Sequence, residues 1–119
     1  MAKTIKIIDY DINNDILFIS NGDKVKVSLD VGDFILDVDH KNLVCGIEVM
    51  NASENLGINK EIFKNIKDMK MSINYKTNHI YVLLMISFKK KGRDVNIQIP
   101  LTLGLGHKRP KKEMLVYGV

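Results

Sequence analysis

The sequence contains little of what would mark a secreted, membrane-spanning or disulfide-linked protein. It has one cysteine, two prolines and no tryptophan in 119 residues. A single cysteine cannot form a disulfide within the chain, which excludes a disulfide framework and favours a reducing compartment. No apolar run reaches the roughly 20 residues of a membrane-crossing helix, and the first residues lack the apolar core of a signal peptide. We therefore expect a cytoplasmic protein that does not enter a membrane.

Each half of the chain is poor in charge of one sign. Residues 1–59 hold 5 basic and 10 acidic residues, whereas residues 60–119 hold 13 basic and 4 acidic residues, so the net charge of +4 divides into −5 and +9. Such a division can hold an intramolecular or head-to-tail contact together, or it can present a positive face to an anionic partner. The alternative is that these charges only solvate exposed strand faces.

Apolar and polar residues alternate over most of the chain, which is the period of a β-strand. We predict a first hairpin around residues 10–15. A second hairpin turn is expected at Asn21-Gly22, because this pair tolerates positive φ, and it returns the chain through residues 25–29. Later hairpins turn at residues 40–42 and 76–79.

The period changes after Asn51. Asn51 or Ser53 can cap a short helical turn that ends at Gly57. After it, the apolar stripe of Ile62, Phe63, Ile66 and Met69 predicts a main helix at about residues 59–68 that is capped by Asn59 and packs on one face of the sheet. The predicted fold class is α+β: an antiparallel sheet of consecutive hairpins with one main helix. Residues 1–101 are expected to form a single domain, and residues 102–119 a basic, glycine-broken C-terminal arm.

The strand at residues 80–86 is apolar on both faces, which a sheet with one solvated face does not require. We predict that the helix shields one side and that another layer or a second subunit shields the other. This favours a homo-oligomer, with a dimer as the first expectation. The predicted self-association residues are Tyr81, Leu83, Met85 and, in the arm, Leu115 and Tyr117.

Four short motifs resemble the pattern of a catalogued family of small domains of unknown function. They are Tyr10-Asp11, Asp15-Ile16-Leu17, Gly46-Ile47-Glu48-Val49 and Ala52-Ser53. The resemblance covers about residues 5–56, and Val49 stands where the family usually has isoleucine. It implies a fold but no assigned activity. It also implies small cytoplasmic proteins that pair with a protein partner, including antitoxin-like arrangements.

Two groups of acidic side chains could form a metal site or an acid–base site, but each group also has a structural interpretation. Asp33, Asp37 and Asp39 share a predicted strand face and can gather with Glu48, although a solvated hairpin face explains them as well. The oxygen side chains at every second position of residues 9–15 resemble the start of a calcium loop. That loop would need glycine at Asn14 and glutamate at Ser20, so a turn explains the segment better.

Other nucleophile and ligand types do not form a recognisable set. The three histidines lie far apart at predicted turns or in the arm, and Cys45 alternates with apolar residues as a buried side chain would. Gly104-x-Gly106 lacks the third glycine of a phosphate-binding loop. The sequence therefore predicts no cofactor, no metal and no catalytic residue.

Two clusters of basic residues are the remaining functional signal. Six or more cations can bind phosphates with strong dependence on salt, although a lysine-rich turn can equally be a protected sheet edge. The candidate anion-binding residues are Lys89, Lys90, Lys91, Arg93, Lys108, Arg109, Lys111 and Lys112. We predict a non-enzymatic protein-interaction module that self-associates, and as the alternative a nucleic-acid-associated or antitoxin-like protein.

Overall fold

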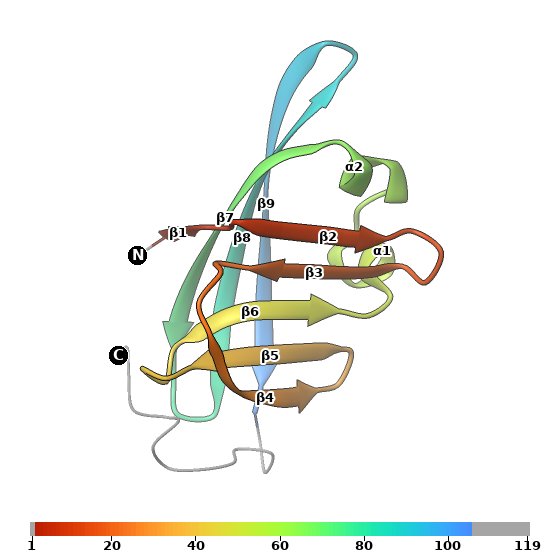
Figure 1. Cartoon of the computed structure of the whole chain (residues 1–119). Coiled ribbons are helices and arrows are strands. Elements are labelled where there is room, and N and C mark those ends of the chain that lie inside the picture. Colours follow the sequence, from red (N-terminus) through yellow and green to blue (C-terminus); the bar gives the residue numbers. More distant parts are fainter. Residues whose placement is uncertain (1, 106–119) are drawn as a thin grey trace.

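The computed structural model describes residues 2–105, with side chains from Thr4 onward. Within this range the chain forms two short helices and nine strands, which assemble into two antiparallel sheets (Figure 1). The elements are β1 (Ala2–Thr4), β2 (Ile7–Asp11), β3 (Ile16–Ser20), β4 (Val25–Val31), β5 (Phe34–Asp39), β6 (Val44–Val49), α1 (Ala52–Leu56), α2 (Lys60–Lys64), β7 (Ile66–Tyr75), β8 (His79–Lys90) and β9 (Arg93–Gly104).

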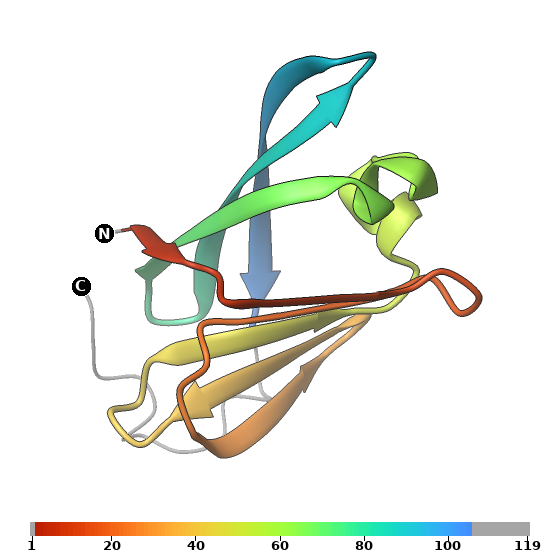
Figure 2. The same ribbon diagram turned by 45° about the horizontal axis from the view of Figure 1, so that its top comes forward.

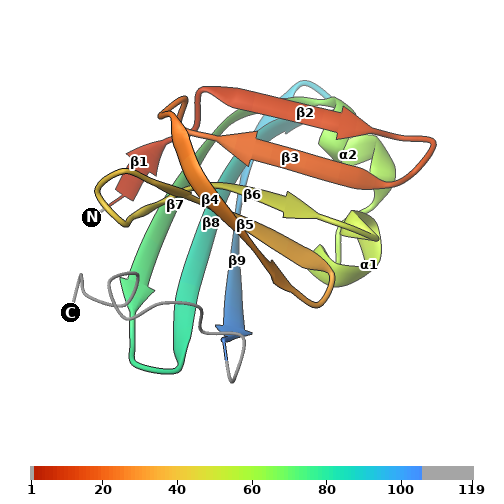
Figure 3. The same ribbon diagram turned by 60° about the horizontal axis from the view of Figure 1, so that its bottom comes forward.

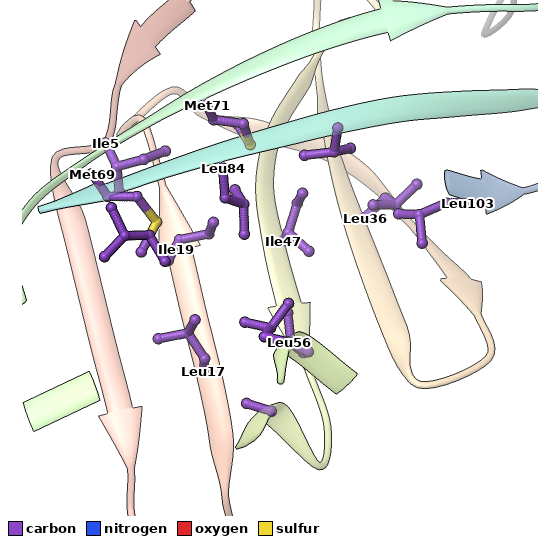
Figure 4. Packing of buried hydrophobic residues seen from close by; sticks show 14 of the residues in the cluster. Ile5, Leu17, Ile19, Leu36, Ile47, Leu56, Met69, Met71, Leu84 and Leu103 are labelled. Carbon is purple, nitrogen blue, oxygen red and sulfur yellow. The ribbon is translucent and has the colours of Figure 1, made fainter. Parts of the chain in front are cut away.

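The two sheets pack face to face, and their strands run across one another (Figure 1). The four-stranded sheet has the order β1-β7-β8-β9, and the five-stranded sheet has the order β2-β3-β6-β5-β4. The core lies between them, where Leu17, Ile19 and Ile47 of one sheet meet Met71 and Leu84 of the other (Figure 4). Full burial of one such side chain contributes about 1.5–3 kcal/mol, so this shared layer is the main source of stability.

One edge of the sandwich is continuous because the chain steps from one sheet to the other at Ile5 (Figure 2). The Ile5 N–H donates to the Met69 carbonyl at 2.9 Å, and the Lys6 N–H donates to the Ser20 carbonyl at 2.9 Å. The side chain of Ile5 is buried in the core. Adjacent residues therefore join β7 on one side and β3 on the other.

Most of the predicted hairpins are confirmed, but the one at Asn21-Gly22 is wrong. Strand β3 pairs with β6, and β4 lies at the far edge of the sheet beside β5. The Asn21 N–H continues the β3–β6 ladder by donating to the Cys45 carbonyl at 2.9 Å. Pairing with β6 places Leu17 and Ile19 in the middle of the sheet, where both are completely buried. Long-range burial thus outweighs the local preference of the dipeptide for a tight hairpin.

The prediction of one main helix at 59–68 is also wrong. The short turn that ends at Gly57 is confirmed as α1, and Asn59 caps α2 as expected, but α2 has only five residues and Asn65 ends it directly before β7. Met69, which the helical stripe included, is completely buried in β7 opposite Ile86. Both helices lie at the end of the sandwich where β2 and β6 finish (Figure 3). The five-stranded sheet, not a helix, covers the four-stranded sheet.

Strand β8 is shielded on one face only. Ile80, Val82, Leu84 and Ile86 are buried against the other sheet, whereas the exposed fraction of Tyr81 is 41%. The sequence predicts that both faces of this strand are shielded from water. Within the described residues only the inner face is buried, and the five-stranded sheet covers it.

Strand β9 continues to Gly104, three residues beyond the expected domain end at 101. The Leu105 N–H then donates to the Asn78 carbonyl at 2.7 Å, and the Leu105 side chain is buried. The first residues of the predicted arm thus belong to the sheet. The remaining arm candidates lie outside the described residues: Lys108, Arg109, Lys111, Lys112, Leu115 and Tyr117.

Candidate functional site

Three of the four signature motifs meet in one polar cluster, formed by Tyr10, Asp15 and Ser53. The Tyr10 hydroxyl donates to Asp15 Oδ1 at 2.7 Å. The Ser53 hydroxyl donates to Asp15 Oδ2 at 2.6 Å, and the Ser53 N–H donates to both carboxylate oxygens at 3.1 and 3.2 Å. Residues 38 positions apart are therefore joined by one half-buried carboxylate.

This cluster supplies the N-terminal cap of α1. Asn51 precedes the helix with φ 48° and makes no capping hydrogen bond with its side chain. The Asp15 carbonyl accepts from the Ala52 N–H at 2.9 Å, and the Asp15 carboxylate accepts from the Ser53 N–H. Unpaired N–H groups at a helix start need such acceptors, and a carboxylate there is the most favourable kind. The motif thus joins the β2–β3 turn to the helix.

Burial and hydrogen bonding in this cluster shift the pKa values of Tyr10 and Asp15. Burial raises the pKa of Tyr10 to about 12, and the hydrogen bond to Asp15 and the nearby negative charges act in the same direction. Burial alone would raise the pKa of Asp15, but the hydrogen bonds from Ser53 and Tyr10 and the charge of Lys60 outweigh it, so the pKa lies below its ordinary value. Asp15 is an anion held by donors, which is a structural arrangement and not that of a general base.

The remaining signature motif contains Gly46 in the central strand β6. A Cβ at this position would lie 3.1 Å from Asp37 Oδ2 and 3.1 Å from the Ile19 carbonyl oxygen. Because β6 is hydrogen-bonded on both sides, the neighbouring backbone has little freedom to move. Close approach of the neighbouring strands therefore favours glycine at position 46. The sequence motif drew attention to these residues, but only the fold shows that they hold strands and helix together.

The four predicted carboxylate candidates do not form one site, and three of them accept hydrogen bonds from different partners. Asp33 accepts from Asn55 at 3.0 Å, and Asp37 accepts from the Ser28 hydroxyl at 2.6 Å. Asp39 is buried and accepts from the Lys41 and Leu43 N–H groups at 2.8 and 3.0 Å. Glu48 lies between Phe18 and Ile35 on the outer face of the five-stranded sheet. Within residues 2–105 no three Asp, Glu, His or Cys side chains gather so that they could hold a metal ion.

Two other motifs have structural roles. Asp11 accepts from the N–H groups of Asn13 and Asn14, each at 3.1 Å, as the turn interpretation predicts. The Cys45 thiol is completely buried, and burial, followed by the charges of Asp39, Asp37 and Asp23, raises its pKa to about 11. A buried thiol with a raised pKa is not an activated nucleophile.

The described part of the basic cluster forms the tip of the β8–β9 hairpin. Lys89, Lys90, Lys91 and Arg93 are all exposed, and Lys91 adopts φ 52° in the turn. Asp94 lies 3.9 Å from the Nζ of Lys89 and 3.9 Å from that of Lys67. A cavity of about 190 Å³ lies between this hairpin and α2, and Lys89, Lys90 and Glu61 are among its lining residues. The hairpin thus presents a surface of predominantly positive charge.

Tyr81, Leu83 and Met85 form a row along β8 on the outer face of the four-stranded sheet. The exposed Tyr81 shares a hydrogen bond of 2.8 Å with His79, whose ring packs edge-on against it. Five of the six cross-strand neighbours of this row carry no charge: Asn74, Ser72, Thr102, Pro100 and Gln98; the sixth is Lys70. The structure therefore brings the described self-association candidates together on one partly exposed surface, where Tyr81 is exposed and Leu83 and Met85 are half-buried.

Comparison with known proteins supports the resemblance. The model of a family described as "Protein of unknown function (DUF2283)" matches residues 7–53. A putative hypoxanthine phosphoribosyltransferase of Methanosarcina mazei is 30% identical over 89 residues, which cover 74% of this chain and 72% of that protein. An uncharacterized protein of Methanocaldococcus jannaschii is 32% identical over 110 residues, which cover 91% of this chain and 78% of that protein. No solved structure matches the chain. None of the helices in residues 2–105 has the length and apolar character that crossing a bilayer requires.

Proposed function

The chain belongs to the family of proteins of unknown function DUF2283, and we propose that it is a non-enzymatic interaction module that binds a second copy of itself. The contact surface is the outer face of the four-stranded sheet, centred on Tyr81, Leu83 and Met85. One observation supports this proposal above others: along β8 Tyr81 is exposed and Leu83 and Met85 are only half-buried, although the residues of the opposite face are buried in the core. The name of the Methanosarcina mazei relative assigns a transferase activity to that protein, and the proposal does not carry this activity over to the present chain.

The composition of this face resembles that of a protein interface. The centres of interfaces are depleted in charge and enriched in tyrosine and methionine, and this row has both properties. Tyr81 offers a large ring whose orientation His79 already fixes, so little side-chain entropy is lost on binding. A symmetric contact of the face with its own copy would place the two rows against each other.

The edge of the same sheet is less suited to association than its face. Strand β9 is the edge strand next to β8, and Pro100 lies opposite Leu83 in the ladder with β8. Proline has no N–H to give to that ladder, so Pro100 lies at a position whose backbone groups point outward, where it interrupts the row of free donors. Edge strands protected in this way resist pairing with a second sheet. This favours contact through side chains of the face.

Replacement of Leu83 by lysine tests the proposed contact. We expect sedimentation velocity at 500 mM salt to show a dimer for the unaltered 13.6 kDa chain and a monomer for Leu83→Lys. A charge at the centre of an apolar contact should weaken the affinity by about tenfold or more. Thr77→Lys, in the exposed β7–β8 turn, adds the same charge away from the face and should leave the dimer intact. A monomer at every concentration of the unaltered protein would contradict the proposal.

The nucleic-acid alternative is favoured by the exposed basic tip of the β8–β9 hairpin. If four cations of this tip bind phosphates, affinity for duplex DNA should fall about 100-fold between 50 and 200 mM salt. The double variant Lys90→Glu, Lys91→Glu should lose this binding, while Lys24→Glu, Lys76→Glu, with the same net charge, should retain it. Titrations with duplex DNA and RNA at both salt concentrations measure this. Absence of salt-sensitive binding at 50 mM would remove the alternative.

A further inference from the structure

The outer face of the five-stranded sheet is a second partly exposed surface, on which Ser20 and Gly46 are buried and the edge-strand residues are exposed. The strand registers place Asp9, Phe18, Glu48, Ile35 and Asp30 in one row from β2 to β4. The adjacent row contains Ile7, Ser20, Gly46, Asp37 and Ser28 in the same order of strands. We call these ten residues the acidic face. It combines four carboxylates with three apolar side chains and contains no lysine or arginine.

The carboxylates of the acidic face have no cationic partner within residues 4–105. The ion pairs of this part of the chain join Lys64 to Glu61 and both Lys67 and Lys89 to Asp94, and none involves the acidic face. Phe18 and Ile35 are half-buried and lie on either side of Glu48. Apolar side chains between carboxylates suit lysine and arginine, whose aliphatic stems pack on apolar surface while the charged ends reach the acids.

The matching cations belong to the other sheet. Lys90, Lys91 and Arg93 are exposed at the tip of the β8–β9 hairpin, and this tip extends beyond the end of the sandwich (Figures 1 and 2). The acidic face points away from the four-stranded sheet, because the opposite face of its own sheet forms the core. A hairpin therefore cannot reach the acidic face of its own molecule. The two surfaces can meet only between molecules.

We propose that the acidic face of one copy binds the basic tip of the β8–β9 hairpin of a second copy. This inference rests on the proposed self-association, to which it adds a second, electrostatic contact. The two surfaces differ, so the contact is head-to-tail and joins molecules into a ring or an open chain. Opposite charges on exposed surfaces attract over about one Debye length, which is about 10 Å at 0.1 M salt, so the contact is sensitive to salt.

A charge exchange between two variants tests this contact. The face variant carries Asp9→Lys and Asp30→Lys, at exposed positions in the two edge strands of the sheet. The hairpin variant carries Lys90→Glu and Arg93→Glu, which lie opposite each other in the ladder. Each variant alone should lose the attraction: the two lysines leave the acidic face of the first variant without net charge, and the two glutamates leave the hairpin tip of the second with Lys91 as its one cation among the three named above. Mixed together, the two variants should bind each other, because the unaltered acidic face of the hairpin variant meets the unaltered hairpin tip of the face variant.

The measurement is binding between differently tagged populations at 50 and 500 mM salt. We expect Leu83→Lys chains, in which the apolar contact is removed and the electrostatic contact is left, to bind each other at least about tenfold more weakly at 500 mM than at 50 mM salt. Each variant alone should lose the low-salt association, and the mixture should regain it. The control pair Asp23→Lys, Glu54→Lys and Lys24→Glu, Lys76→Glu reproduces the net charges away from both surfaces. If the control variants lose the association equally, or if the mixture does not regain it, the proposal is wrong.

The two proposed contacts can be separated. The contact through Leu83 is apolar, so it should persist at 500 mM salt, where the electrostatic contact is weak. The charge exchange is therefore also made in Leu83→Lys chains. Recovery of binding in that mixture supports the head-to-tail contact whatever happens to the apolar dimer, and absence of recovery overturns it even if the dimer is intact.

Discussion

The Asp15→Ala variant is expected to lose about 3 kcal/mol of unfolding free energy, because a half-buried carboxylate that accepts charge-assisted hydrogen bonds is removed. The Tyr10 hydroxyl and the Ser53 hydroxyl and N–H lose their common acceptor, and α1 keeps only the backbone carbonyl of residue 15 as its cap. Caps alone contribute about 1 kcal/mol, so the loss should exceed that of a simple cap. Urea unfolding followed by circular dichroism measures the difference.

Asp11→Ala is the matched control, since Asp11 is an exposed aspartate of the same turn. Its loss should be clearly smaller. Equal losses for the two variants would show that the turn, and not the contact with Ser53, determines the stability of this region.

The effect of Asp15 should also depend on pH. Its pKa in the folded chain lies below the ordinary 3.8, so the stabilisation is present above that value and is lost as the pH falls through the folded pKa. The stability difference between the unaltered protein and Asp15→Ala should therefore shrink below about pH 4. Tyr10 has the opposite sign: with a folded pKa of about 12, its contribution is present below the ordinary 10.0 and is lost as the pH rises from there toward 12.

Gly46→Ala should destabilise the protein by about 2 kcal/mol, and Gly46→Val by about 3 kcal/mol, because overpacking between hydrogen-bonded strands cannot relax. The Ile19 carbonyl oxygen, 3.1 Å from the new Cβ, belongs to the adjacent strand backbone. Alanine in place of glycine normally stabilises a chain through the entropy of the unfolded state. A loss of unfolding free energy in Gly46→Ala would therefore show that the added Cβ is too close to its neighbours, because the unfolded-state effect alone would give a gain.

Gly104→Ala provides the control for Gly46. Gly104 has no heavy atom within 4 Å of an added Cβ and lies at the end of β9. Its replacement should leave the urea midpoint unchanged or raise it. A stabilising effect of Gly46→Ala would contradict the assignment of this glycine to close packing.

These two predictions separate the family signature from function. Tyr10, Asp15, Gly46 and Ser53 hold α1 and the centre of the five-stranded sheet in place. Such structural roles can explain why family members share this sequence pattern, without a common catalytic or binding activity. The proposed contacts lie elsewhere, on the outer face of β8, on the tip of the β8–β9 hairpin and on the acidic face.

Several hairpins could be predicted from the sequence, because the alternation of apolar and polar residues and the choice of turn residues depend only on neighbouring positions in the chain. The hairpins β2–β3, β5–β6 and β7–β8 follow from it. The same reasoning failed at Asn21-Gly22 and at residues 66–68. A turn dipeptide does not decide which strand is the neighbour, and Ile62, Ile66 and Met69 fit a helical stripe although Ile66 and Met69 lie in a strand.

The amino-acid sequence by itself determined that the fold is built of antiparallel hairpins, that acidic and basic charges are divided between the halves of the chain, and that the strand 80–86 carries apolar residues on both faces. The tertiary structure decided what those features mean. It placed β3 beside β6 and one sheet over the other, because burial of residues distant in sequence outweighs local turn preference. It also brought Asp15 to Ser53 and left the charged surfaces on opposite sides of the core, which no local pattern specifies.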